Sequence, residues 1–195
     1  MRPIVLLGVL VALLIGLFWG CGTYNTFVDK EVNVEETWGN VQNAYQRRAD
    51  LIPNLVKTVK GQADFESGTL EKVVQARANA TSINVDASEL TPENMAKFQQ
   101  AQSQLSGSLS RLMMTVERYP ELKANQGFMQ LQAQLEGTEN RIKVARDRFN
   151  KEVSAYNKSV RKMPSAFVAS ITGFDEKGMF EAQQGAENAP DVNFE

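Results

Sequence analysis

The sequence predicts an all-α protein: an antiparallel up-and-down four-helix bundle whose first helix continues from a transmembrane helix at the N-terminus. Three observations support this fold class. Residues 4–19 contain only apolar residues and glycine, which is close to the roughly 20 residues that cross a bilayer. In the rest of the chain, apolar residues recur at steps of three and four, as they do on one face of a helix. No run of β-branched residues alternates with polar ones, so no strand is predicted.

The N-terminal segment predicts a single transmembrane helix over residues 4–24. No charged residue occurs from position 3 to position 28, and Trp19 is expected at the membrane surface, where amphipathic rings settle. In the alternative interpretation, the segment is a lipoprotein signal: Cys21 is acylated and the residues before it are removed. The balance of Arg2 before the segment against Lys30 after it favours a body outside the cytoplasm, by a thin margin. The predicted location is therefore the cell membrane, with a single pass or a lipid anchor at Cys21.

The remaining residues predict a helical body over 25–163 and a tail over 164–195 that packs near the membrane-proximal end. Thr91 and Pro92 are typical of a helix start, and Asp50 can cap a helix that has Pro53 in its first turn. Tyr119 precedes a proline, which ends a helix. These signals predict four bundle helices, over residues 25–48, 51–80, 92–119 and 121–162.

Four antiparallel helices would bring two polar turns, 47–54 and 117–125, together at the end farthest from the membrane. Paired arginines there could bind carboxylates or phosphates, and an aromatic residue could anchor a partner. The alternative role for these residues is structural: helix capping, and ion pairs between the turns. The candidate binding surface consists of Arg47, Arg48, Asp50, Asn54, Glu117, Tyr119, Lys123 and Asn125.

Several polar residues fall on or beside the apolar faces of the predicted second and fourth helices. They predict a polar network of salt bridges between helices, formed by Glu66, Arg77, Glu139, Asn140 and Arg146. Carboxylates inside a helical bundle also suggest a di-iron site. That site type needs histidine, which this chain lacks, so neither a metal nor another cofactor is predicted.

Composition excludes several function classes. The absence of histidine excludes Ser-His-Asp and Cys-His catalysis and histidine-ligated zinc. A single cysteine excludes an internal disulfide. The net charge of −2 gives no basic excess of the kind that nucleic-acid binding needs, so no nucleic-acid partner is expected.

Several motifs resemble those of the LemA family. They lie at Tyr24-Asn25, in the run from Arg47 to Val56, in the run from Val116 to Asn125, and at Glu139-Asn140-Arg141-Ile142. The resemblance covers essentially the whole chain. It implies a small bacterial membrane protein with one N-terminal span and a helical bundle, and it implies no defined biochemical activity. Cys21 departs from the family pattern, in which a small residue such as serine is more typical.

The functional prediction is a non-enzymatic scaffold or adaptor of the cell envelope, which contacts the lipid bilayer and binds another envelope protein through the distal turns. One alternative is an accessory subunit or a hydrolase that uses carboxylates such as Glu117 or Glu139. A second alternative is a structural homo-oligomer, because heptad-like stripes can also pack between chains.

Overall fold

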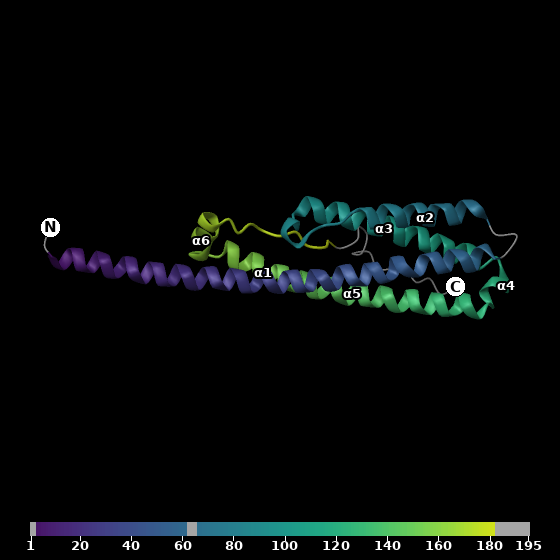
Figure 1. Cartoon of the computed structure of the whole chain (residues 1–195), viewed down its shortest axis with the longest axis horizontal. Coiled ribbons are helices and arrows are strands. Elements are labelled where there is room, and N and C mark those ends of the chain that lie inside the picture. The colour runs from purple at the N-terminus through teal and green to yellow at the C-terminus, as the bar shows by residue number, and fades with distance from the viewer. Residues whose placement is uncertain (1–2, 62–65, 182–195) are drawn as a thin grey trace, which may run out of the picture.

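The computed structural model describes residues 3–61 and 66–181, with side chains described from residue 7 onward, and over these residues it is helical without strands (Figure 1). The all-α prediction is therefore confirmed for the described part of the chain. In order, the elements are α1 (Pro3–Lys60), α2 (Ser67–Ser82), a short 3-10 turn η1 (Ala87–Glu89), α3 (Pro92–Val116), α4 (Pro120–Lys123), α5 (Gln126–Arg161) and α6 (Ser165–Thr172).

Helix α1 is one uninterrupted helix of 58 residues. Its N-terminal part extends beyond the other helices as a bare rod (Figure 1), and its apolar side chains there are exposed, for example Phe18 at 76%. Among the described residues it is the one helix that is long and apolar enough to cross a membrane. As predicted, this apolar segment continues without a break into the first helix of the body.

The predicted boundary between the first two bundle helices was wrong. The chain does not turn at residues 49–50, because α1 runs through Pro53 to Lys60. Residues 51–60, which were assigned to a second helix, therefore belong to α1, and α2 begins at Ser67. The predicted helix start at Thr91 and the predicted helix end before Pro120 are confirmed. The side chain of Thr91 accepts a hydrogen bond from the backbone of Asn94 at the start of α3, and α3 ends shortly before Pro120.

The helices pack in two pairs, α1 with α5 and α2 with α3, and α1 also contacts α2. Two apolar clusters fill the space between them. The cluster nearer the N-terminus is rich in aromatic rings and is formed mainly by α1, α3, α5 and the C-terminal segment, and includes Phe27, Trp38, Phe98, Phe149, Tyr156 and Phe180. The other is mostly aliphatic and includes Ile52, Leu55, Val73, Leu105, Leu112 and Leu135.

Helix α6 lies at the end of the bundle nearest the N-terminus, and in Figure 1 only α1 continues beyond it. Its buried residue is Ala169. Gly173 ends the helix in a left-handed conformation with φ of 77°, which a residue without a Cβ adopts at little cost. Phe174 follows and packs against the rings of Tyr24 and Phe27 on α1, at centroid distances of 5.4 and 5.2 Å.

After α6 the chain reverses and runs along the bundle as an extended segment, residues 174–181, here called the C-terminal strap. Two asparagines of α5 hold its backbone. The side-chain amide of Asn157 donates to the carbonyl of Lys177 at 2.8 Å and accepts from the amide of the same residue at 2.9 Å. Asn150 makes the same pair of bonds with Phe180, at 2.8 and 2.9 Å. Seven residues of helix and three of extended chain both rise about 10 Å, so the two spacings match.

The other side of the strap is held by α3 and by the loop before it. Gln99 exchanges two hydrogen bonds with the backbone of Glu181, and the amide of Gly178 donates to the carbonyl of Leu90 at 2.7 Å. A Cβ on Gly178 would lie 2.8 Å from the Cα of Pro92, which no side chain can accommodate without movement. Glycine is therefore needed here for close approach. The predicted tail spans 164–195, and its residues 182–195 lie outside the described residues.

Candidate functional site

The most buried charged side chain of the described chain is Arg48, on α1, which is 1% exposed. Its guanidinium donates to the hydroxyl of Ser106 at 2.7 Å, to the side-chain carbonyl of Gln102 at 2.6 Å, and to the carboxylate of Glu139 at 2.8 Å. The face of the Tyr45 ring lies 5.0 Å from the guanidinium carbon. This one side chain therefore joins α1 to both α3 and α5.

The bonds around Arg48 extend to a fourth helix. Gln102 donates through its own amide to the carbonyl of Ala80 in the last turn of α2, at 3.2 Å. Glu139 remains 46% exposed, so its charge keeps contact with water while it pairs with the buried arginine. A buried charge is tolerated only when it is paired and hydrogen-bonded. The network thus specifies the register of the helices and leaves Arg48 inaccessible to a partner.

Pro53 lies inside α1, where the sequence predicted a turn, and a hydrogen bond from α2 explains why the helix continues. A proline inside a helix has no N–H, so the carbonyl four residues earlier loses its partner. That carbonyl belongs to Ala49, which is buried, and the guanidinium Nε of Arg77 on α2 donates to it at 2.7 Å. Arg77 therefore replaces the hydrogen bond that the proline removes, and it does so from a helix that is adjacent only in the folded protein.

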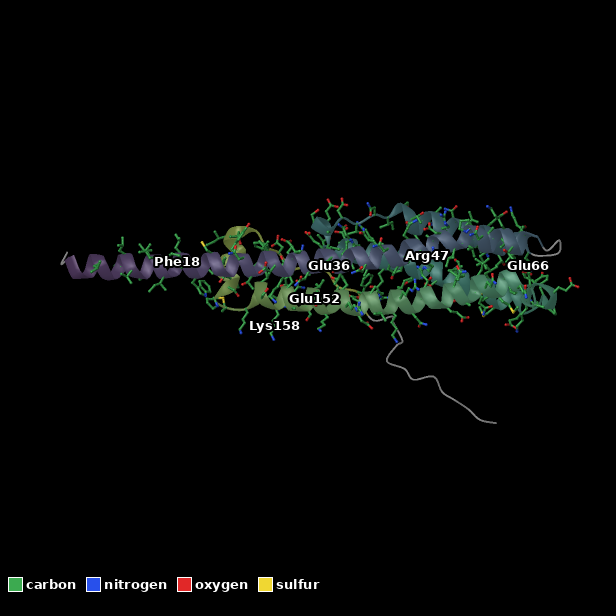
Figure 2. All side chains as sticks on the ribbon, turned by 60° about the horizontal axis from the view of Figure 1, so that its bottom comes forward. Phe18, Glu36, Arg47, Glu66, Glu152 and Lys158 are labelled. Atoms are coloured by element: carbon green, nitrogen blue, oxygen red, sulfur yellow. The ribbon has the colours of Figure 1, made fainter. Side chains whose placement is uncertain are left out.

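The candidate binding surface predicted from the sequence is divided by this geometry. Arg47, Asp50 and Asn54 are exposed on α1, but they lie along its length and not at a turn. Figure 2 shows Arg47 in the middle of the bundle and Glu66 at its far end. Thirteen residues of helix, about 20 Å, separate Arg47 from the last residue of α1. The prediction that two turns meet was therefore wrong for the turn at 47–54, because Arg47, Asp50 and Asn54 lie within α1.

The remaining predicted residues do lie together at the end of the bundle opposite the N-terminal rod, here called the distal end (residues 61, 66 and 117–125). Glu117 and Lys123 form an exposed ion pair across the turn that contains α4. Asn125 caps α5, because its side chain accepts from the backbone of Phe128 at 3.1 Å. Tyr119 is partly buried against the aliphatic cluster. Capping and packing thus account for two of these residues, and the Glu117–Lys123 pair remains accessible.

The predicted polar network is only partly assembled. Glu139 and Arg77 take part in interhelical bonds, as described above. Glu66 lies outside the apolar face predicted for it: it precedes α2, is 51% exposed, and pairs with Arg118 at 3.1 Å across the distal end. Asn140 is exposed on α5, beside a shallow groove. Arg146 instead holds the strap, with its guanidinium 4.5 Å from the Phe180 ring.

Sequence reasoning missed Arg48 as a buried group and missed the strap. The signals were present but weak: Gln102 interrupts the apolar stripe of α3, and Asn150 and Asn157 stand seven residues apart on α5. The strap also carries a partly buried ion pair. Lys177, 9% exposed, reaches Glu31 of α1 at 2.8 Å.

Two buried tyrosines have raised pKa values. Burial raises the pKa of Tyr45, and the nearby guanidinium groups of Arg146 and Arg48 offset part of that rise. Burial also raises the pKa of Tyr156, with a further contribution from the carboxylate of Glu31. Both effects favour the neutral phenol. The geometry around these rings is that of a packed core and offers no reacting pair.

Among the described residues, no group of three cysteine, aspartate or glutamate side chains is placed to hold a metal ion. Cys21 is exposed on α1. The two carboxylates considered for catalysis lie apart: Glu117 pairs with Lys123 at the distal end, and Glu139 pairs with Arg48 within the bundle.

Comparison with known proteins gives one family match and several curated relatives. The family model described as the LemA family matches residues 37–194. The curated relatives include magnetosome proteins MamQ 1 and MamQ 2 of Paramagnetospirillum magneticum, each 27% identical over 179 residues, which cover 81% of this chain and 64% of the relative. Protein LemA of Metamycoplasma hominis is 23% identical over 174 residues, covering 88% of this chain and 76% of the relative.

The chain thus spans less than two thirds of the length of the MamQ relatives. None of these names indicates a catalytic activity. The family model covers most of the body, including the Arg48 network, the distal end and the strap. This chain belongs to the LemA family.

Proposed function

We propose that the protein is a membrane-anchored, non-enzymatic scaffold or adaptor, an antiparallel bundle of α1, α2, α3 and α5 that presents its distal end to a partner protein. The observation that carries the proposal is the continuity of α1 from the exposed apolar segment to Lys60. A bundle built on that helix has no linker between anchor and body. From Tyr24 to Lys60 the helix rises roughly 55 Å, so the distal end is held at a fixed height above the membrane.

The partner surface proposed here is narrower than the one predicted from the sequence. Arg48 is excluded by burial, and Arg47 and Asp50 lie about 20 and 15 Å along α1 from Lys60, its last residue. Asn54 is nearer, about 9 Å from Lys60, but it belongs to the helix and not to the distal turn. The exposed ion pair of Glu117 and Lys123 remains, next to the pair of Arg118 and Glu66. Two exposed ion pairs on one end favour a charged protein surface as the partner, because electrostatic complementarity selects partners and their orientation.

Site-specific photocrosslinking in native membranes tests the proposal. A photoreactive residue at Ala124, exposed at the distal end, is compared with one at Asn43, exposed in the middle of α1. The expected result is a crosslink from Ala124 to one protein other than a copy of this chain, with none from Asn43. Equal yields from both positions, or crosslinks only between copies of this chain, would contradict the proposal.

A charge exchange separates recognition from stability. The double variant Glu117→Lys, Lys123→Glu keeps an ion pair across the turn but reverses its direction. The melting temperature should stay unchanged, because an exposed pair contributes little to stability. The crosslink from Ala124 should be lost, since a charged partner would meet the wrong signs. Retention of the crosslink would show that this pair does not take part in recognition.

A further inference from the structure

Helix α6 carries an apolar stripe that the bundle does not cover. Phe167 is 66% exposed and Ile171 is 69% exposed, and Met163, just before the helix, is 72% exposed. Phe167 and Ile171 are four residues apart within α6, so they lie on one face of the helix. The opposite face contains the buried Ala169, which packs in the aromatic-rich cluster. A soluble helix of eight residues rarely leaves two large apolar side chains exposed on its outer face without an occupant.

The position of α6 along α1 identifies the occupant. Val168 of α6, and Phe174 just after the helix, pack against the cluster that contains Phe27, and Phe174 also meets Tyr24. Tyr24 lies about 7.5 Å beyond Trp19, the last residue of the apolar run, and Phe27 about 12 Å beyond it. A helix with its side chains is about 10–12 Å wide. The side of α6 that faces the N-terminus is therefore level with the end of the apolar run, where the headgroup region of a bilayer begins.

We infer that α6 is an interfacial helix that inserts Phe167 and Ile171 into the surface of the same bilayer that anchors α1. Short apolar faces bind in this way at the boundary between headgroups and acyl chains, with aromatic rings at the level of the headgroups. The structure would then contact the membrane at two places, the α1 segment and α6, and α1 could not rotate freely about its own axis.

The charges near α6 are compatible with lipid phosphates. Lys158 and Lys162 are exposed at the end of α5, directly before α6, and Figure 2 shows Lys158 projecting away from the bundle. Arg161 is the third cation, and it pairs with Glu176 at 3.3 Å. Asp175 also lies exposed at this end, so the local charge is mixed. Insertion is therefore driven by the apolar stripe, and the lysines contact phosphates of any phospholipid.

The inference depends on membrane anchoring, and it holds for either anchor. If Cys21 carries the lipid, the bilayer still begins three residues before Tyr24. It does not depend on a protein partner at the distal end. Crosslinking from Ala124 can therefore fail while α6 remains at the membrane, and the reverse is equally distinguishable.

Spin-label accessibility in vesicles tests it directly. The full chain with Cys21→Ser is reconstituted in vesicles of phosphatidylcholine and phosphatidylglycerol. A nitroxide is attached at Ser170→Cys, beside the stripe, or at Ser110→Cys on α3 as the matched exposed control. Oxygen concentrates in the acyl region and a nickel chelate stays in water. The ratio of oxygen to nickel accessibility should be several-fold higher at position 170 than at position 110.

Three further results decide the matter. In the Phe167→Ser, Ile171→Ser variant the ratio at position 170 should fall towards that of position 110, while the melting temperature of the bundle in detergent stays the same, since both residues are exposed. High nickel accessibility at position 170 in the parent chain would overturn the inference. So would dipolar broadening of the position 170 spectrum, which would show that a second copy of the chain covers the stripe.

Discussion

The hydrogen bond from Arg77 to Ala49 predicts a thermodynamic coupling between Arg77 and Pro53. Replacing Arg77 with Met keeps the apolar stem but removes the donor, so the buried carbonyl of Ala49 loses its partner. Hydrogen bonds that involve a charged group contribute about 1.5–3 kcal/mol, and an unsatisfied buried acceptor costs about 1–3 kcal/mol. We expect Arg77→Met to lower the free energy of unfolding by about 2 kcal/mol.

The coupling appears when proline is replaced as well. Pro53→Ala restores a backbone N–H that can donate to the carbonyl of Ala49 within α1. In that background Arg77→Met should cost less than about 1 kcal/mol, so the double-mutant cycle should give an interaction energy of about 1–2 kcal/mol. Urea unfolding of the full chain in detergent micelles, followed by far-UV circular dichroism, measures all four corners. Additive losses, within about 0.5 kcal/mol, would refute the argument.

The remaining predictions concern the buried arginine, the strap and pH. Arg48→Ala should lower the free energy of unfolding by about 2–4 kcal/mol, because three partners lose a buried charge, whereas Arg47→Ala should change it by less than about 0.5 kcal/mol; similar values for both, from the same urea titrations, would contradict the structure. Gly178→Ala should lower the free energy of unfolding by about 1–3 kcal/mol through overpacking, and it should increase proteolysis within residues 174–181. Met179→Ala, at the neighbouring half-exposed position, should change neither quantity. If the strap of Gly178→Ala resists proteolysis as well as that of the parent, the strap is held differently. Because the pKa of Tyr45 is raised, the folded state holds the phenol proton more tightly than the unfolded state does. The stability that the protonated phenol contributes is therefore complete below pH of about 10 and is lost as pH rises further. Unfolding free energies should be measured from pH 9 to pH 12, which is about one unit below to two units above the ordinary tyrosine pKa. They should fall less steeply with pH in Tyr45→Phe than in the parent. Parallel curves would argue against a buried phenol.

The sequence predicted well whatever depends on neighbours along the chain. The apolar run before Cys21 predicted the exposed rod, and the apolar steps of three and four in the rest of the chain predicted helices with one buried face, such as α3. Thr91 with Pro92 and Tyr119 with Pro120 located two helix ends, because capping and the geometry before proline act over only a few residues. These signals are local, so a single sequence is enough to interpret them.

The errors occurred where distant residues override a local rule. Pro53 is expected in a first helical turn, but Arg77 supplies the missing donor from 24 residues later and α1 continues. The displaced boundary puts Arg47, Asp50 and Asn54 within α1 and not in the predicted turn. Arg48 was assigned to the same surface, but its partners lie 54 and 91 residues away along the chain, and no periodicity reports such pairing.

The strap has a consequence for how the protein is made. Trp38 lies on the first helix to be synthesised, and its ring packs within 6.2 Å of Phe180, almost at the end of the described chain. About 140 residues separate the two, so at typical rates of 5–20 residues per second the aromatic cluster waits on the order of 10 s for its last ring. Throughout that interval, the core of the nascent chain is open on one side. Translation that stops before the strap would leave chains with an exposed aromatic face, the form of this protein that quality-control proteases should recognise first.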